Sequence, residues 1–160
     1  MKRTMLTLNH AVLFLCTSMY LGTGGSLVLF SFPVESKLTP DNYYLQFVPQ
    51  VQAATHFFTY MTILMIALAI VMSISEWRTK LRWVPIVVLL GVLAATGLTM
   101  SMIFPLNDEM ARGITDSARL HEVLSRWMSL NRVRVGIWVV QWASMMVWYG
   151  YWAKKAREAT

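Results

Sequence analysis

The sequence has few charged residues and almost no cysteine, and each scarcity excludes a class of protein. Of its 160 residues, 14% are charged and 56% are hydrophobic, and the mean hydropathy is +0.49. This composition is too apolar for an ordinary soluble domain of this size. The single cysteine, Cys16, excludes an internal disulfide and a Cys-x-x-Cys site. The chain has no internal repeat or low-complexity tract, and its length predicts one domain over residues 1–160.

Charged residues are missing altogether from four long stretches. These stretches contain no Asp, Glu, Lys or Arg and cover residues 10–32, 54–75, 83–104 and 135–153. About 20 apolar residues are enough for a helix to cross the hydrocarbon core of a membrane. We therefore predict an all-α protein, a bundle of four transmembrane helices. The first stretch is too long for a signal peptide and lacks a cleavage site, so we expect it to remain as a span.

The remaining charges are divided unequally between the two predicted sides of the membrane. The chain ends and the short loop 76–82 carry eight basic and two acidic residues, whereas the other loops carry six of each. Basic residues are enriched on the cytoplasmic side. We therefore expect a multi-pass protein of the plasma (inner) membrane with both termini in the cytoplasm. The net charge of +6 then reflects topology, and no basic-aromatic array indicates a nucleic-acid partner.

The longest predicted loop, residues 105–134, has a helical pattern of its own. Asp116 or Ser117 is placed to cap a helix. Apolar residues then recur at three- and four-residue spacing, at Leu120, Val123, Leu124, Trp127 and Leu130. We expect a helical extracytoplasmic cap that begins near Ser117 and continues into the fourth span.

Two arginines at the start of the fourth span are predicted to face in different directions. On a continuous helix, Asn131 and Arg134 extend the apolar stripe that runs from Trp127 to Trp138. Arg134 should therefore point into the bundle. Arg132 lies about 200° away around the helix and can reach water.

An arginine inside the bundle needs acceptors, because an unpaired buried charge is costly. The third span ends in FPLND, so Asp108 and Asn107 are its natural partners, although an Asp108–Arg134 pair could also serve only to hold two helices together. The second span begins on the same side with Gln52 and His56. We predict that one outer pocket is formed by Gln52, His56, Asn107, Asp108, Asn131 and Arg134, with Trp127 and Trp138 as apolar walls.

Small residues recur at four-residue spacing in two of the predicted spans. Such stripes allow helix backbones to approach closely. The stripes are Ser18, Gly22 and Ser26 in the first span and Gly91, Ala95 and Thr99 in the third. We predict that these faces are packing faces within the bundle.

The stretch LTMSMIFPLND, followed by RWMSLNRVRV, resembles the anthrone oxygenase-like family of small four-helix membrane proteins. Members typically have a Pro-Leu-Asn motif after the third span and a W-x-x-x-N-H-V-R-type motif at the fourth. The matching residues here are Pro105, Leu106, Asn107, Trp127, Asn131 and Arg134. Arg132 stands where the family often has histidine, so a catalytic base at that position is missing here.

The resemblance implies oxygenation of an aromatic or phenolic molecule without metal or flavin. Such a reaction needs a base, a group that holds the enolate oxygen, and a dry cavity of aromatic size. A carboxylate beside Arg134 would be a weak base, which favours His56 over Asp108. In this interpretation the catalytic residues are His56, Asp108 and Arg134, and the ligand-binding residues are Gln52, Asn107, Trp127, Asn131 and Trp138.

Two other interpretations stay open, and the cofactor is unknown. One is a metal or haem protein, because thioether and imidazole groups suit copper. The candidate copper ligands are His56, His121, Met100, Met102 and Met110, whereas His10 and His56 lie too far apart in the predicted topology to share a haem. The other is a non-catalytic subunit of a larger membrane complex or a homo-oligomer. A closed, water-excluding pocket beside Arg134 favours chemistry or ligand binding, whereas a solid salt-bridged plug with flat apolar outer faces favours a structural subunit.

Overall fold

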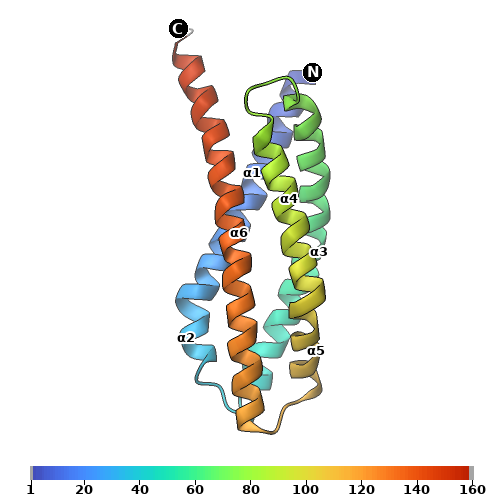
Figure 1. Ribbon diagram of the computed structural model, residues 1–160, viewed down its shortest axis with the longest axis vertical. Helices are drawn as coiled ribbons and strands as arrows, with labels where there is room; N and C mark the ends of the chain where they lie inside the picture. Colours follow the sequence, from blue (N-terminus) through green and yellow to red (C-terminus); the bar gives the residue numbers. More distant parts are fainter. Residues whose placement is uncertain (1, 159–160) are drawn as a thin grey trace.

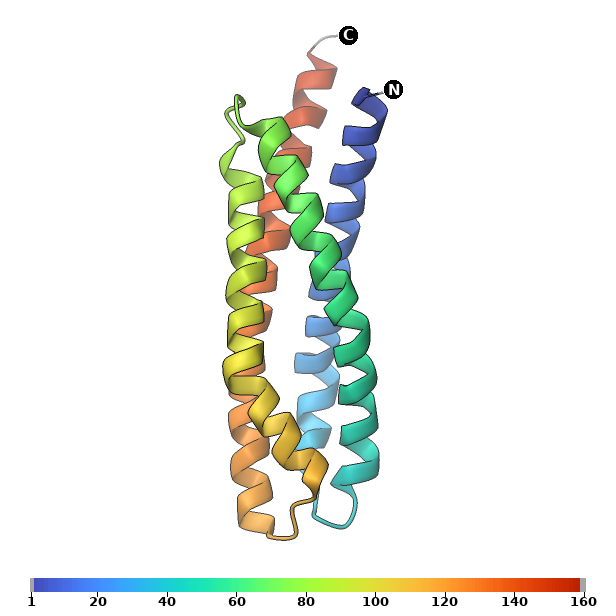
Figure 2. The same cartoon turned by 90° about the vertical axis from the view of Figure 1, so that its right-hand side faces the viewer.

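The computed structural model describes residues 2–158, which form four long helical rods lying side by side (Figures 1 and 2). Two of the rods contain a short π-helical segment between two α-helices. In chain order the elements are α1 (Lys2–Ser26), η1 (Leu27–Ser31), α2 (Phe32–Glu35), α3 (Tyr43–Glu76), α4 (Trp83–Leu98), η2 (Thr99–Ile103), α5 (Phe104–Arg112) and α6 (Ser117–Arg157). The described residues contain no strand, which confirms the predicted all-helical class.

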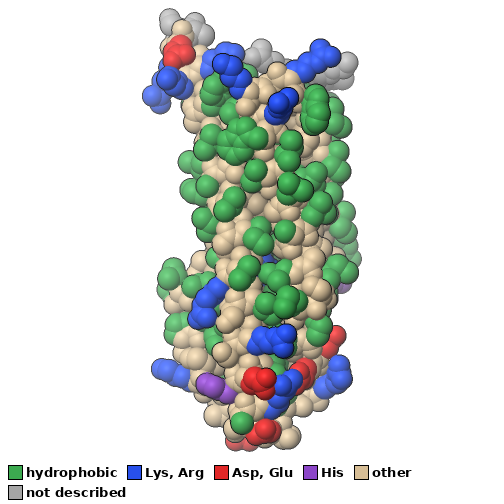
Figure 3. Space-filling view, viewed as in Figure 1, with side chains coloured by type: hydrophobic (Ala, Val, Ile, Leu, Met, Phe, Trp, Pro, Cys, Tyr) green, Lys and Arg blue, Asp and Glu red, His purple; other side chains and the backbone are tan. Residues whose placement is uncertain are grey.

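Three of the rods are long and apolar enough to cross a membrane. They comprise Thr4–Glu35, Tyr43–Glu76 and Trp83–Arg112. Figure 3 shows Lys and Arg gathered at one end of the bundle, charges of both signs near the other, and a broad hydrophobic band between them. The helix α3 begins at Tyr43, well before the predicted second span at residues 54–75.

The two ends of the bundle are built differently. The start of α1, the turn 77–82 and the end of α6 lie at one end, which we call the terminal end (Figure 1). The links 36–42 and 113–116 lie at the other, which we call the capped end. There the side chain of Asp116 accepts hydrogen bonds from the backbone N–H groups of Ala118 and Arg119. This cap starts α6, which runs without a break to Arg157 and confirms the predicted continuous helix.

Buried apolar side chains form two separate cores. The terminal core lies in the half of the bundle near the chain ends and includes Leu13, Met65, Val84, Val88 and Met145. The capped core lies at the opposite end and is built around Phe32, Tyr43, Phe47, Leu124 and Trp127. A cavity, described below, lies between the two cores.

Two glycines let helices of the bundle come close to α6. A Cβ atom on Gly91 would lie 2.7 Å from the Gln141 side chain, and one on Gly24 would lie 2.8 Å from Trp138. The predicted packing role of Gly91 is therefore confirmed. The stripe predicted through Gly22 is wrong, because a Cβ there would meet nothing within 4 Å. Gly24 lies two residues further on, about 200° around the helix, so a different face of α1 is in contact.

Proline and π-helical segments occur together at the capped ends of two rods. Pro33 follows η1 near the start of α2, and Pro105 follows η2 near the start of α5. Proline has no N–H group and disturbs the regular hydrogen bonding of the preceding turn. A π turn accommodates one extra residue and rotates the following face of the helix. Figure 2 shows α5 tilting away from the line of α4 and toward α3.

Candidate ligand-binding cavity around Arg134

A cavity of about 540 Å³ lies inside the bundle and is lined by all four rods. Aromatic side chains from the two cores border it: Tyr20 and Trp138 toward the terminal end, and Phe47 and Trp127 toward the capped end. The rings of Tyr20 and Trp138 have centroids 4.7 Å apart, and those of Phe47 and Trp127 have centroids 4.8 Å apart. The space between the two cores is therefore an open cavity with an aromatic pair near each end.

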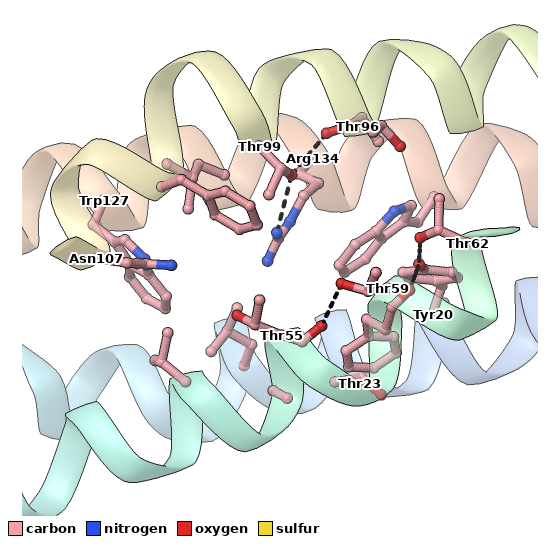
Figure 4. Close-up of a pocket in the computed structure, with 18 of the residues that line it drawn as sticks. Tyr20, Thr23, Thr55, Thr59, Thr62, Thr96, Thr99, Asn107, Trp127 and Arg134 are labelled. Carbon is pink, nitrogen blue, oxygen red and sulfur yellow. Dashed lines mark hydrogen bonds between the residues drawn. The ribbon is translucent and has the colours of Figure 1, made fainter. Parts of the chain in front are cut away.

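Arg134 extends from α6 into this cavity (Figure 4). Its guanidinium donates one hydrogen bond to Thr99 Oγ1, at 3.2 Å, and another to Asn131 Oδ1. Its Cζ lies 4.8 Å from the ring centroid of Trp138, a cation–π distance. Its Nε is buried without a hydrogen-bond partner. The predicted inward orientation of Arg134 is confirmed.

Asn131, Trp127 and Asn107 form a hydrogen-bonded chain beside Arg134. Asn131 is fully buried, and its amide donates to the backbone carbonyl of Trp127 at 2.8 Å while its oxygen accepts from Arg134. The indole of Trp127 donates to Asn107 Oδ1 at 2.8 Å. Because the oxygens of both amides are engaged, this chain fixes the side chains of Trp127 and Arg134. Four of the predicted site residues thus lie together, with Trp138 beside them.

The partner predicted for Arg134 is wrong. Among the described residues no carboxylate forms an ion pair with Arg134, and Asp108 is exposed. An uninterrupted α-helix would place Leu106 on the face of Thr99, whereas one extra residue per π turn brings Asn107 to that face. Asp108, the next residue, then points to the side of the cavity.

Asp108 lies instead in a second, smaller pocket of about 320 Å³ between α3 and α5, which we call the α3–α5 groove. Gln52 and His56, both exposed, line the same groove. Thr55 and Asn107 line both the groove and the cavity. The single outer pocket predicted from the sequence is therefore two neighbouring pockets. His56 follows Thr55 directly, and adjacent residues of a helix point about 100° apart.

Arg132 behaves as the sequence predicted. It is exposed on the face of α6 away from the cavity, and its Cζ lies 5.2 Å from the ring centroid of Phe32. Arg132 and Arg134 are therefore two arginines of one helix in two different environments, one at the surface and one in the interior.

Threonine hydroxyls form much of the remaining cavity wall, and the sequence analysis missed them. Thr59 donates to the carbonyl of Thr55 at 2.8 Å, and Thr99 donates to that of Ala95 at 2.7 Å. A threonine that returns its proton to its own helix keeps its oxygen available as an acceptor. The signal was their helical spacing within apolar spans: the lining threonines are Thr23, Thr55, Thr59, Thr62, Thr96 and Thr99 (Figure 4).

The cavity also contains one carboxylate, which the sequence analysis did not identify. Glu35, the last residue of α2, lines the cavity, and its Oε2 is buried with no hydrogen-bond partner. Ser31, Gln46 and Gln50 line the cavity as well. No pattern in the sequence marks Glu35, because it lies in a predicted connection and its position depends on how α2 packs.

The three histidines proposed for a copper or haem site are not brought together. His10 is buried in the terminal half, where its Nε2 lies 3.2 Å from Ser75 Oγ. His56 lies in the α3–α5 groove, and His121 is exposed on α6. Within residues 2–158 no three His, Cys, Asp or Glu side chains are grouped as metal ligands would be.

The cavity has groups that suit an organic ligand. The contacts among the described residues show no arrangement typical of a catalytic site. Arg134 supplies a cation, the threonines and amides supply hydrogen-bonding groups, and the aromatic pairs supply apolar surface. Comparisons with protein-family models, with curated proteins and with solved structures find no match to this chain.

Proposed function

We propose that this protein is a four-span membrane protein that binds a small hydrophobic molecule, aromatic or phenolic, in the cavity around Arg134. In this proposal α6 is the fourth span and the terminal end faces the cytoplasm. Large apolar side chains such as Ile63, Ile74 and Leu90 are exposed along the rods, as expected for contact with lipid. The excess of basic residues near the chain ends supports the orientation.

The size of the cavity supports an occupant. Its volume of about 540 Å³ lies within the range of about 300–1,000 Å³ that is usual for small-molecule sites.

The observation that carries the proposal is the state of Arg134. A buried guanidinium without a carboxylate partner destabilises the fold, because its desolvation is not offset by an ion pair. Thr99 and Asn131 provide two neutral acceptors, and Nε has none. An anionic oxygen of a ligand would supply the missing acceptor and the missing charge. A phenolate, enolate or carboxylate group has the required chemistry.

The aromatic residues at the cavity ends support a ligand with planar rings. Trp127 and Trp138 are three helical turns apart on α6, which corresponds to about 16 Å at 1.5 Å per residue. Between them the wall alternates apolar side chains with hydroxyl groups. A flat ring system can contact the indoles edge-on or face-on while its oxygen lies at Arg134.

An oxygenase-like reaction stays a prediction within this proposal. Arg134 is suited to stabilise an enolate oxygen, as the family resemblance implies. The two predicted bases, His56 and Asp108, line the α3–α5 groove and not the cavity. Binding is therefore the function that the geometry supports best. The cavity in place of a salt-bridged plug likewise favours binding over the role of a purely structural subunit.

The test is binding of naphthoate, an aromatic carboxylate, to the protein purified in mild detergent. Titration is followed by quenching of tryptophan fluorescence, and native mass spectrometry checks for a ligand retained from the cell. We expect Arg134→Met to weaken naphthoate binding at least tenfold and to leave the thermal unfolding midpoint unchanged or higher, because a desolvated charge is removed.

Arg132→Met is the matched control, since Arg132 is exposed two residues away on the same helix. It should leave the affinity for naphthoate unchanged. Uncharged methylnaphthalene should bind the parent and Arg134→Met equally. Equal naphthoate affinity in the parent and in Arg134→Met would disprove the proposal.

A further inference from the structure

Four buried side-chain atoms among the described residues have no hydrogen-bond partner. Two are indole nitrogens, of Trp148 and Trp152, which pack against the terminal core. The other two are Arg134 Nε and Glu35 Oε2, and both residues line the cavity. The cavity thus holds one cation and one carboxyl group, each with an atom that still needs a partner.

These two groups are too far apart to satisfy each other. Tyr20 of α1 and Trp138 of α6 lie at the same level, because their rings are in contact. From that level Glu35 lies fifteen residues toward the capped end and Arg134 lies four residues in the same direction. At about 1.5 Å per residue, the two residues differ in level by about 16 Å. No ion pair between them is formed.

The cavity changes character between the two groups. Around Arg134 it is lined by hydroxyls and the indole of Trp138. Between Arg134 and Glu35 the rings of Phe47 and Trp127 line it together with Ser31 and Gln50. An occupant of the full length therefore meets a cation, then a wall of aromatic rings and polar side chains, then a carboxyl group.

We propose that the natural ligand is an elongated, rigid aromatic molecule with an anionic oxygen at one end and a hydroxyl group at the other. The anionic oxygen binds Arg134, and the hydroxyl donates a hydrogen bond to Glu35. This inference rests on the proposed function and adds the length and the second polar group of the ligand. Each group of the ligand then satisfies one of the two unpartnered atoms.

The experiment compares three pairs of rigid aromatic carboxylates in mild detergent. The pairs are benzoate, naphthoate and biphenyl carboxylate, each with and without a hydroxyl at the end opposite the carboxylate. We expect the hydroxyl to improve affinity about three- to tenfold for the biphenyl pair, because it gives the unpartnered buried oxygen of Glu35 a hydrogen-bond donor. The two shorter pairs should show no gain, since they cannot reach both groups.

The variant Glu35→Met has a side chain of similar size without a polar oxygen. It should abolish the advantage of the hydroxylated biphenyl, so that both members of the biphenyl pair bind with the same affinity. This outcome, with a thermal midpoint close to that of the parent, supports the inference. Glu109→Met, which removes a carboxylate outside the cavity, should leave the hydroxyl preference intact.

The two proposals fail in different ways. If all carboxylates depend on Arg134 but none gains from a hydroxyl, the inference about Glu35 is wrong and the proposed function stands. If carboxylate affinity does not depend on Arg134, both are wrong. A hydroxyl gain that persists in Glu35→Met also contradicts the inference, because another group then binds the hydroxyl.

Discussion

The two halves of the bundle use the same four rods for different purposes. In the terminal half, side chains such as Leu13, Met65 and Val88 are fully buried and the helices are in direct contact. Toward the capped end the rods enclose a cavity of about 540 Å³ around a cation without a counter-ion. The halves also differ in their polar groups: the terminal half buries a few single polar side chains such as His10 and Glu76 among packed apolar residues, whereas several threonines line the cavity.

The difference shows where stability and function are divided in this protein. The terminal core and the capped core hold the rods together on both sides of the cavity, so the cavity can keep groups that lower stability. Arg134 is the main example, because its burial without a carboxylate is unfavourable. If this division is correct, substitutions in the terminal half change unfolding, whereas substitutions around the cavity change binding.

The largest effect on stability is expected at Met65. Its side chain is fully buried in the terminal core, so Met65→Ala should lower the free energy of unfolding by about 2–5 kcal/mol. The adjacent Leu64 is 45% exposed, and Leu64→Ala is the matched control with an effect of about 1 kcal/mol or less. Thermal or denaturant unfolding in detergent measures both. Equal losses would mean that the terminal half is not a packed core.

A second comparison uses two small residues one turn apart on α4. Gly91 faces Gln141 so closely that Gly91→Leu should cost about 1–3 kcal/mol or prevent folding. Ala95 is buried but lines the cavity, and Ala95→Leu should cost less than Gly91→Leu because part of the larger side chain can extend into the cavity.

The same Ala95→Leu protein should bind naphthoate at least tenfold more weakly than the parent, since its side chain occupies part of the site. Fluorescence titration and the unfolding midpoint together separate the two effects. Strong destabilisation by Ala95→Leu would argue against an open cavity at this position.

A smaller effect is expected when Arg134 loses an acceptor. Thr99→Val removes the hydroxyl that accepts from the guanidinium and should cost about 1 kcal/mol, because water in the cavity can replace part of the bond. Thr96→Val, also in the cavity wall but not bonded to Arg134, is the control. If both variants unfold at the same midpoint, the Thr99 contact contributes nothing to stability.

The smallest effect is expected at the surface of the capped end. Arg119 pairs with Glu109 at 2.7 Å and with Glu122 at 2.8 Å, and these carboxylates raise the pKa of its guanidinium above the ordinary value. The group is exposed, so Arg119→Gln should shift the unfolding midpoint only slightly, and less in high salt. A large shift that salt does not reduce would show that this network supports the capped end.

Much of the architecture could be predicted because it depends on local properties of the chain. The four uncharged stretches become helical rods, and Asp116 caps a helix that continues to Arg157. The opposite directions of Arg132 and Arg134 follow from their positions on one unbroken helix. Within such a helix, the angle between any two residues is fixed by the helical repeat.

The neighbours of Arg134 could not be predicted in the same way. Asn107 faces the cavity and Asp108 faces the α3–α5 groove, and the π turn of η2 sets the rotation of both residues. The position of Glu35 depends similarly on η1 and on the packing of α2. A single extra residue in a turn rotates everything that follows, and an apolar sequence gives no clear sign of it.

The helical class, the number of rods, the unbroken length of α6 and the inward direction of the Arg134 side chain follow from the amino-acid sequence. Periodicity and the absence of charge specify these features within each segment. Packing between the helices sets three further features: Arg134 has no acidic partner among residues 2–158, a cavity separates the two cores, and Glu35 lines this cavity. Those facts depend on the rotation and tilt of one helix against another, which are set by contacts between distant residues.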